Sequence, residues 1–341
     1  MILSVERACQ VLGPQIPPRL IDASAWDRIC ALAAGLPPLF GWGIFECRLR
    51  EGENRVDALF CISRREGGRA ALTQWLAQDH QRSTLGPAGR FLGAWLETGG
   101  LLEAEVPLAW LEYDLPGSGP DEPFVQFCVD REYPNAHRSP ALTPLRLRSL
   151  AQQGLGLLLG RSPDSVRLAM LERCVERLPL GGRILHLGVM PRRGTDDIRM
   201  LAAIPTSQAA AWLDAIAWPG DPRQLSLMMD LIGDRFSRLS VQLDVGTSIG
   251  PQLAIEFPMT TRPDRDPAWV DFMDRLAEAG LCHPAKAQSA LDWIGEETVD
   301  LPDAEWLVSI DRRLDVKVIA NERGALEAKA YLCFHPRYVL V

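Results

Sequence analysis

The chain has 341 residues, of which 47% are hydrophobic and 23% are charged, and it carries a formal net charge of −8 at pH 7. This acidic balance argues against a nucleic-acid-binding protein, because binding by counterion release needs a basic face. No apolar run approaches the roughly 20 residues that cross a membrane, and the charges at Glu6 and Arg7 come too early for a signal peptide, so we expect a cytoplasmic protein.

The eight cysteines are scattered, and no two of them stand at the CxxC spacing of redox or metal sites. We therefore expect buried free thiols in a reducing compartment. The five histidines form no HExxH or HxH pair, so the sequence predicts no metal-ligating residues.

Five pairs of short segments alternate apolar and polar residues with a period of two, which is typical of strands with one apolar face. Turn-forming residues join the members of each pair, as in PGSGPDEP after Leu115 and PRRGTDD after Met190. The predicted strand pairs are Ile44–Arg50 with Arg55–Ser63, Leu108–Leu115 with Phe124–Asp130, Arg183–Met190 with Ile198–Ile204, Leu239–Val245 with Gln252–Phe257, and a last pair within Trp306–Pro336. In the third pair, the alternation predicts that Leu185 faces the apolar side and His186 the polar side.

Helical patterns separate these strand pairs. Ser24 is the predicted N-cap of an early helix, and Ser162, followed by Pro163 and Asp164, is the predicted start of a later one. The predicted helices are Ser24–Ala34, Arg69–Gln78, Pro87–Thr98, Leu145–Leu159, Pro163–Arg177, Ser207–Ala217, Pro222–Ile232, Pro267–Ala279 and Pro284–Ile294.

The five pairs begin near residues 44, 108, 184, 239 and 307, so one supersecondary unit recurs along the chain. Sequential hairpins form an antiparallel sheet whose apolar face needs a cover of helices, and closing that sheet removes its edges. We therefore predict an α+β fold with one domain over residues 1–341: a closed ten-stranded antiparallel barrel of five αββα repeats, with helices outside and polar strand faces inside. The alternative, two separate sheets, would need a long Pro/Gly linker near the middle of the chain, which the sequence lacks.

The last strand pair also contains a short motif, K-A-Y-L, at Lys329 to Leu332. With this motif and the five helix–hairpin–helix units from about residue 24 to residue 336, the chain resembles the ABBA, or PT-barrel, prenyltransferases. It looks nearest to their bacterial peptide-modifying, cyanobactin-type branch. The resemblance implies a barrel in which basic residues and tyrosines hold an isoprenyl diphosphate and shield an allylic cation, while a carboxylate takes a proton from the acceptor.

The inward strand faces of the predicted barrel bring together polar side chains from different strands. The basic members are Arg48, Arg199, Lys317 and Lys329; the acidic members are Glu46, Glu112, Asp114, Asp244, Glu256 and Asp311; the others include Gln126, His186, Gln242, Ser309, Tyr331 and Trp110.

We expect the four basic side chains to clamp a diphosphate, because arginine and lysine both bind phosphate oxygens. Tyr331 and Trp110 are the expected shields of the allylic cation. Glu112 is the first candidate for the base, and Asp114 is the second. A second possibility stays open, in which the acidic residues coordinate Mg²⁺ that bridges the diphosphate. The remaining expected substrate-binding residues are Gln242, Asp244 and His186.

The sequence thus predicts a prenyltransferase that uses isoprenyl diphosphate as co-substrate. The expected acceptor is electron-rich, either a side chain of a ribosomally synthesised peptide or an aromatic small molecule. A hypothesis of another class also stays open: a non-catalytic peptide-binding accessory protein of a natural-product pathway, whose acid-rich lumen would favour a basic guest. A transferase should bind an isoprenyl diphosphate, and a receptor should not.

Overall fold

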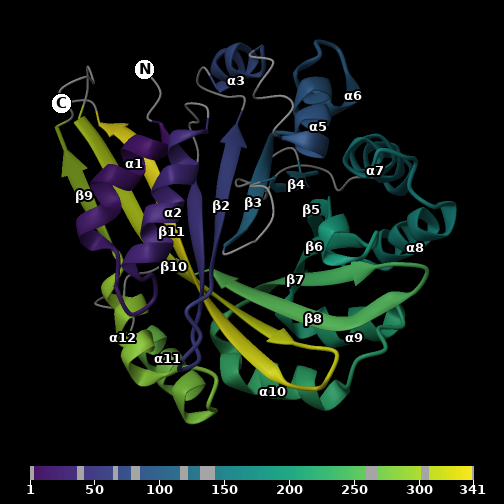
Figure 1. Ribbon diagram of the computed structural model, residues 1–341. Coiled ribbons are helices and arrows are strands. Elements are labelled where there is room, and N and C mark those ends of the chain that lie inside the picture. The colour runs from purple at the N-terminus through teal and green to yellow at the C-terminus, as the bar shows by residue number, and fades with distance from the viewer. Residues whose placement is uncertain are drawn as a thin grey trace.

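The computed structural model describes residues 4–36, 42–63, 68–77, 85–115, 122–130, 143–258, 267–300 and 307–339. Three parts of the predicted elements lie outside these residues: Trp306 of the last strand pair, Gln78 of a predicted helix, and most of the PGSGPDEP connection. Within them, ten strands close into an antiparallel barrel with helices around its outside (Figure 1).

The barrel strands follow one another in chain order around the ring. They are β1 (Gly43–Arg48), β2 (Val56–Ser63), β3 (Leu108–Leu115), β4 (Phe124–Cys128), β5 (Arg183–Val189), β6 (Ile198–Pro205), β7 (Arg238–Val245), β8 (Ile249–Pro258), β10 (Leu307–Ala320) and β11 (Leu326–Val339). The pairing of β1 with β11 closes the ring. The predicted fold class, a closed ten-stranded antiparallel barrel in an α+β chain, is confirmed.

An eleventh strand, β9 (Gly295–Val299), was not predicted from the sequence. It pairs with Val308–Arg312 in the first half of β10, whereas β8 pairs with Asp315–Ala320 in the second half. Both partners fit because β10 is 14 residues long. The segment GEETV is short and mostly polar, so its sequence alone carries little strand signal.

The helices connect successive hairpins and cover the outer face of the barrel (Figure 1). In the described residues they are α1 (Val5–Leu12), α2 (Ala23–Ala34), α3 (Gly68–Leu76), α5 (Gly86–Leu96), α6 (Leu101–Glu105), α7 (Pro144–Leu159), α8 (Ser165–Glu176), α9 (Ala209–Ala215), α10 (Pro222–Ile232), α11 (Ala268–Glu278) and α12 (Pro284–Asp292). None of these combines the length and the apolar composition needed to cross a bilayer.

Two predicted helix starts are wrong by one or two residues. Asp22, and not Ser24, caps α2, with its carboxylate accepting a hydrogen bond from the Ala25 backbone at 2.8 Å. Asp164, and not Ser162, caps α8. In both helices an aspartate near the predicted serine takes the cap position, where a carboxylate satisfies free backbone N–H groups and also meets the positive end of the helix dipole.

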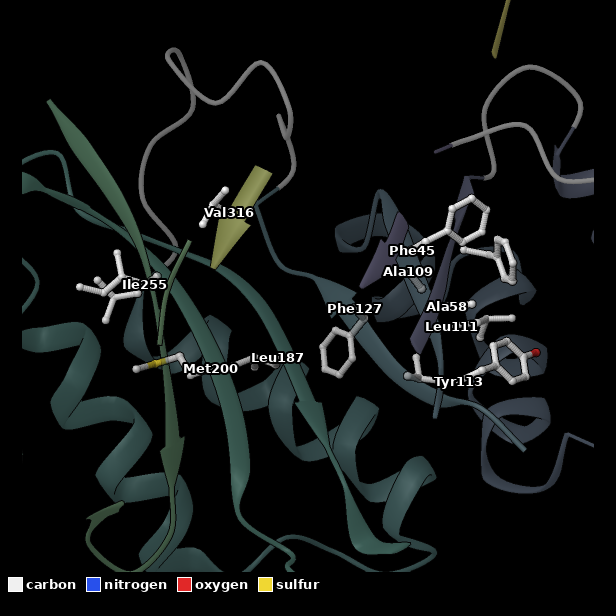
Figure 2. Close-up of a cluster of buried hydrophobic side chains, with 14 of the residues drawn as sticks. Phe45, Ala58, Ala109, Leu111, Tyr113, Phe127, Leu187, Met200, Ile255 and Val316 are labelled. Carbon is white, nitrogen blue, oxygen red and sulfur yellow. The ribbon is translucent and has the colours of Figure 1, made fainter. Parts of the chain in front are cut away.

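The hydrophobic core lies between the outer face of the barrel and the helices. Figure 2 shows outward-facing side chains from β1 to β10 that contribute to this layer, among them Phe45, Leu111, Phe127 and Ile255. Trp95, Trp212 and Trp293 are fully buried in it. Their indole N–H groups donate to backbone carbonyls, which satisfies the one polar atom of each ring. The eight cysteines are free, as expected.

Candidate active site in the barrel lumen

The lumen contains a chamber of about 460 Å³, within the size range of small-molecule sites. All ten barrel strands contribute to its wall. The lining residues are Ile44, Glu46, Leu59, Trp110, Glu112, Gln126, Leu185, His186, Arg193, Arg199, Leu201, Ser240, Gln242, Gln252, Glu256, Pro258, Asp315, Lys317, Ile319, Lys329 and Tyr331.

Most of the predicted site residues meet at this chamber, although they come from six different strands. Glu112, Arg199, Lys317, Lys329, Tyr331, Trp110, Gln242 and His186 line it, as do Glu46, Gln126 and Glu256. Arg48, Asp114 and Asp244 point to the inside of the barrel but lie behind or beside lining residues, with which they form ion pairs. Asp311 and Ser309 lie farther along β10, where they contact Arg313 and Glu296.

Three cations lie side by side across the seam where the barrel closes. Lys317 on β10 is the direct register partner of Lys329 on β11, which is in turn the partner of Arg48 on β1. We call Lys317, Lys329 and Arg48 the cation row. Like charges directly opposite each other on neighbouring strands destabilise a sheet unless anions compensate them.

Carboxylates supply that compensation. Glu46 accepts from Lys329 at 2.7 Å and from Arg48 at 2.9 Å, and Arg48 also pairs with Asp57 at 2.8 Å. Burial alone would raise the pKa of Glu46, but Lys329, Lys317 and Arg48 hold it well below its usual range. Burial and the neighbouring Glu46 instead raise the pKa of Asp57 to about 6.

On the other side of the cation row, Lys317 is held by β7 and β8. Its ammonium donates to Gln242 at 2.7 Å and pairs with Glu256 at 3.0 Å, and it lies 5.6 Å from the ring centre of Tyr331. Burial, together with Glu46 and Glu256, raises the pKa of Tyr331 well above its usual value, so this phenol is neutral at physiological pH. The side chain can therefore donate a hydrogen bond and present a neutral ring to the chamber.

A second cluster of charged side chains surrounds Glu112 on the opposite wall of the chamber. Glu112 accepts from Gln126 and from Arg193, both at 2.7 Å. Arg193 also binds Asp114, and its guanidinium lies 5.0 Å from the ring centre of Phe124. Burial disfavours the charge of Arg193, but the two carboxylates outweigh this effect and raise its pKa above the ordinary value.

The remaining basic residue of the prediction, Arg199, donates to Asp244 at 3.0 Å across β6 and β7. Burial opposes its charge, but Asp244 raises its pKa. Each of the four predicted cations is thus already neutralised by at least one carboxylate, so an incoming diphosphate would have to displace these partners.

The chamber is apolar toward the end of the barrel where the strands join the helices. Leu59, Cys61, Leu108, Trp110 and Cys128 form one buried cluster. Trp42 and Ile44 pack against it, and the ring centres of Trp42 and Trp110 are 6.2 Å apart. Along β3 the side chains change from Trp110 to Glu112 and Asp114 toward the hairpin turn, so the chamber has an apolar end and a charged end.

The prediction for β5 was wrong for one residue. A β-bulge between Ile184 and His186 places both Leu185 and His186 on the chamber wall, whereas strict alternation had put them on opposite faces. Burial lowers the pKa of His186 to about 4, so its imidazole is neutral at pH 7.

Sequence reasoning missed three further charged members of the lumen. Arg193 was hidden in a turn, and Asp315 lies in β10 between Asp311 and Val316, where the alternation was not followed although the strand is regular. Asp57 is the single acid within an otherwise apolar strand, VDALFCIS, which was a usable signal. A second signal is compositional: the chain contains only three lysines, Lys286, Lys317 and Lys329, and two of them line the chamber.

The carboxylates do not gather as metal ligands would. Among the described residues, no group of three or more histidines, cysteines, aspartates and glutamates is placed to hold a metal ion. The donor set of these residues therefore does not fit a preformed Mg²⁺ site.

No protein-family model matches this chain, and no curated protein matches it either. The function therefore has to be inferred from the chamber itself.

Proposed function

We propose that this protein is a prenyltransferase, which moves an isoprenyl group from an isoprenyl diphosphate to an electron-rich acceptor such as a side chain of a ribosomally synthesised peptide. The observation that supports this most directly is the cation row beside an apolar, tryptophan-lined pocket in one chamber of the barrel. An isoprenyl diphosphate has the same division into an anionic head and an apolar tail.

In this proposal the diphosphate replaces carboxylates on Lys317 and Lys329, with Arg199 on the facing wall as a third contact. The exchange is favourable because a diphosphate offers more charge and more acceptor atoms than a carboxylate. Two register-paired lysines also gain from an anion placed between them. Arg48 is buried beneath three carboxylates and keeps Glu46 and Asp57 in place.

The chemistry then follows from the two ends of the chamber. As the C–O bond of the donor breaks, its electron pair leaves on the diphosphate, and the allylic carbon becomes cationic beside the faces of Trp110 and Tyr331. The acceptor forms the new bond to that carbon, and Glu112 takes the proton that the acceptor loses. The closed barrel limits water, which would otherwise trap the cation.

Calorimetric titration with dimethylallyl and geranyl thiolodiphosphates, with and without Mg²⁺, tests the donor site. Lys329→Ala should weaken binding by about ten- to a hundredfold, because a charge-assisted hydrogen bond is worth about 1.5–3 kcal/mol. Arg313→Ala is the matched control: Arg313 lies on the neighbouring strand β10 and also pairs with a carboxylate, that of Asp311, but it lies outside the chamber. Absence of binding to the wild-type protein under every condition would refute the proposed function.

The three lysines allow an independent measurement. An amine-reactive label followed by mass spectrometry should show protection of Lys317 and Lys329 by a thiolodiphosphate. Lys286, which donates to the carbonyls of Arg48 and Glu53 outside the chamber, should label equally with and without the ligand. Equal labelling of all three lysines despite measurable binding would place the donor elsewhere.

A receptor for a basic peptide is the second candidate, and the number of acidic groups favours it. In the described part of the lumen, eight carboxylates surround five cations, counting Arg48 and the partners behind the wall: Glu46, Asp57, Glu112, Asp114, Asp244, Glu256, Asp315 and Glu327 against Arg48, Arg193, Arg199, Lys317 and Lys329. Peptide binding without thiolodiphosphate binding would support the receptor over the transferase.

A further inference from the structure

Arg193 differs from the other four cations of the lumen in how it is held. The others lie on strands, and their side chains are at most 12% exposed. Arg193 belongs to the short 3₁₀ turn Pro191–Arg193 between β5 and β6, and its side chain is 33% exposed. It reaches from this turn into the mouth of the chamber.

The groups that receive Arg193 form a complete guanidinium site. Glu112 and Asp114 lie two residues apart on one face of β3, and each accepts hydrogen bonds from the same guanidinium. The ring of Phe124 on β4, the register partner of Glu112, covers the guanidinium from one side. Two carboxylates and an aromatic face are the groups that recognise a planar, delocalised cation.

We propose that Glu112, Asp114 and Phe124 bind the guanidinium of an arginine side chain in a guest peptide, and that Arg193 occupies this place until the guest arrives. The proposal deepens the proposed function, on which it rests, by naming the acceptor class. An exchange of one guanidinium for another keeps both carboxylates paired, so the guest does not leave buried charges uncompensated. Arg193 is free to make this exchange because its turn borders solvent, whereas Arg48 is buried under Glu46, Asp57 and Glu327.

The excess of carboxylates in the lumen favours the same guest. A cationic side chain offsets part of the excess negative charge in the lumen. This effect is largest after a diphosphate has displaced carboxylates from the cation row, because those carboxylates have then lost their cationic partners. Donor and acceptor should therefore bind cooperatively. In the transfer step, Glu112 takes a proton from the bound guanidinium. A nitrogen of the resulting neutral guanidine forms a C–N bond to the allylic carbon, while the C–O bond breaks and its electron pair leaves on the diphosphate.

Titration of the full-length protein with the tripeptide acetyl-Gly-Arg-Gly-amide, and with its citrulline counterpart, tests the inference. Citrulline has the shape of arginine without the charge, so we expect the arginine peptide to bind at least tenfold more tightly. Arg193→Ala should strengthen binding of the arginine peptide by about fivefold or more, because it removes an internal competitor for the site. Asp114→Asn, at a position 40% exposed and so tolerant of change, should weaken it.

The matched control is Arg192→Ala on the same turn. Arg192 also lies over Phe124, at 4.5 Å, but binds the backbone carbonyl of Glu122. The Arg192→Ala substitution should change the affinity for the arginine peptide less than twofold. Equal affinity for the arginine and citrulline peptides, or no gain in Arg193→Ala, would overturn the inference.

Titration of the same samples with geranyl thiolodiphosphate separates the two proposals. If the thiolodiphosphate binds and the arginine preference is absent, the acceptor class is wrong and the transferase proposal stands. If the peptide preference is present and the thiolodiphosphate does not bind, the guanidinium site stands and the donor chemistry fails.

Discussion

Neighbouring acids in the lumen have different proton affinities because strand register gives them different neighbours. Glu46 lies opposite Tyr331 and Asp57, and two cations of the cation row bind it directly. Asp57 has acids on both sides, Glu46 on β1 and Asp114 on β3, and among the described residues Arg48 is its single ion-pair partner. The pKa of Glu46 is therefore held low while that of Asp57 rises to about 6, so Asp57 is the member of the pair that takes up a proton first.

His186 should make the stability of the protein depend on pH. Its pKa is about 4 in the folded protein because it is buried, against about 6.5 in the unfolded chain. Between these values the unfolded chain binds a proton that the folded protein does not, so the unfolding free energy falls as the pH is lowered from about 6.5 to about 4. The full loss from this one group is about 3 kcal/mol.

Urea unfolding of the wild type and of His186→Leu between pH 8 and pH 4.5 measures this contribution. The difference in unfolding free energy between the two proteins should be constant above about pH 7.5. At lower pH the wild type should lose stability relative to the variant. His335, whose pKa is also lowered to about 4, is present in both proteins and so cancels. If the difference in unfolding free energy stays constant over the whole pH range, the pKa of His186 is the same in the folded protein as in the unfolded chain.

At the scale of elements, α7 packs onto the barrel through a glycine. A Cβ atom on Gly154 would lie 2.6 Å from the ring of Phe127 on β4, which is closer than carbon atoms pack. Gly154→Ala should therefore destabilise the protein by about 1–3 kcal/mol, because the ring or the helix must move. The unfolding free energy from urea denaturation measures the change.

Gly156 provides the control on the same helix. A Cβ there would meet its nearest neighbours only at 3.7 Å and 3.8 Å, in ordinary van der Waals contact. Gly156→Ala should leave stability unchanged or raise it by up to about 1 kcal/mol, because alanine favours a helix more than glycine does. Similar losses in both variants would mean that α7 does not lie as closely on β4 as the structure has it.

A strand or helix could be predicted from the sequence where its pattern of apolar and polar residues depends only on neighbouring residues in the chain. Period-two alternation identified all ten barrel strands, and it assigned Glu112, Lys317 and Lys329 to the lumen because an uninterrupted strand keeps its two faces separate. It failed at Leu185, because a bulge depends on pairing with another strand. It also failed at Arg193, because no periodicity describes a turn whose side chain reaches residues about eighty positions away in the sequence.

At the scale of the whole molecule, the chamber exists only because the ring is closed. Lys329 and Glu46, which come from the last and the first barrel strand, form an ion pair across the seam, and their strands are joined along six register pairs. The polar character of the inner faces could be read from the sequence. The volume of the chamber and the partner of each charge could not, because both depend on how far neighbouring strands are offset when the ring closes.

Removal of β11 tests whether closure determines stability as well as the site. A chain ending at Gly324 leaves the edges of β1 and β10 without a partner strand and exposes the lumen. We expect it to lose the cooperative urea transition and to associate, as measured by intrinsic fluorescence and size-exclusion chromatography. A chain ending at Val339, which keeps β11 whole, should unfold like the full-length protein. If the shorter chain also unfolds cooperatively and stays monomeric, the remaining strands form a stable sheet on their own and the seam serves only to enclose the site.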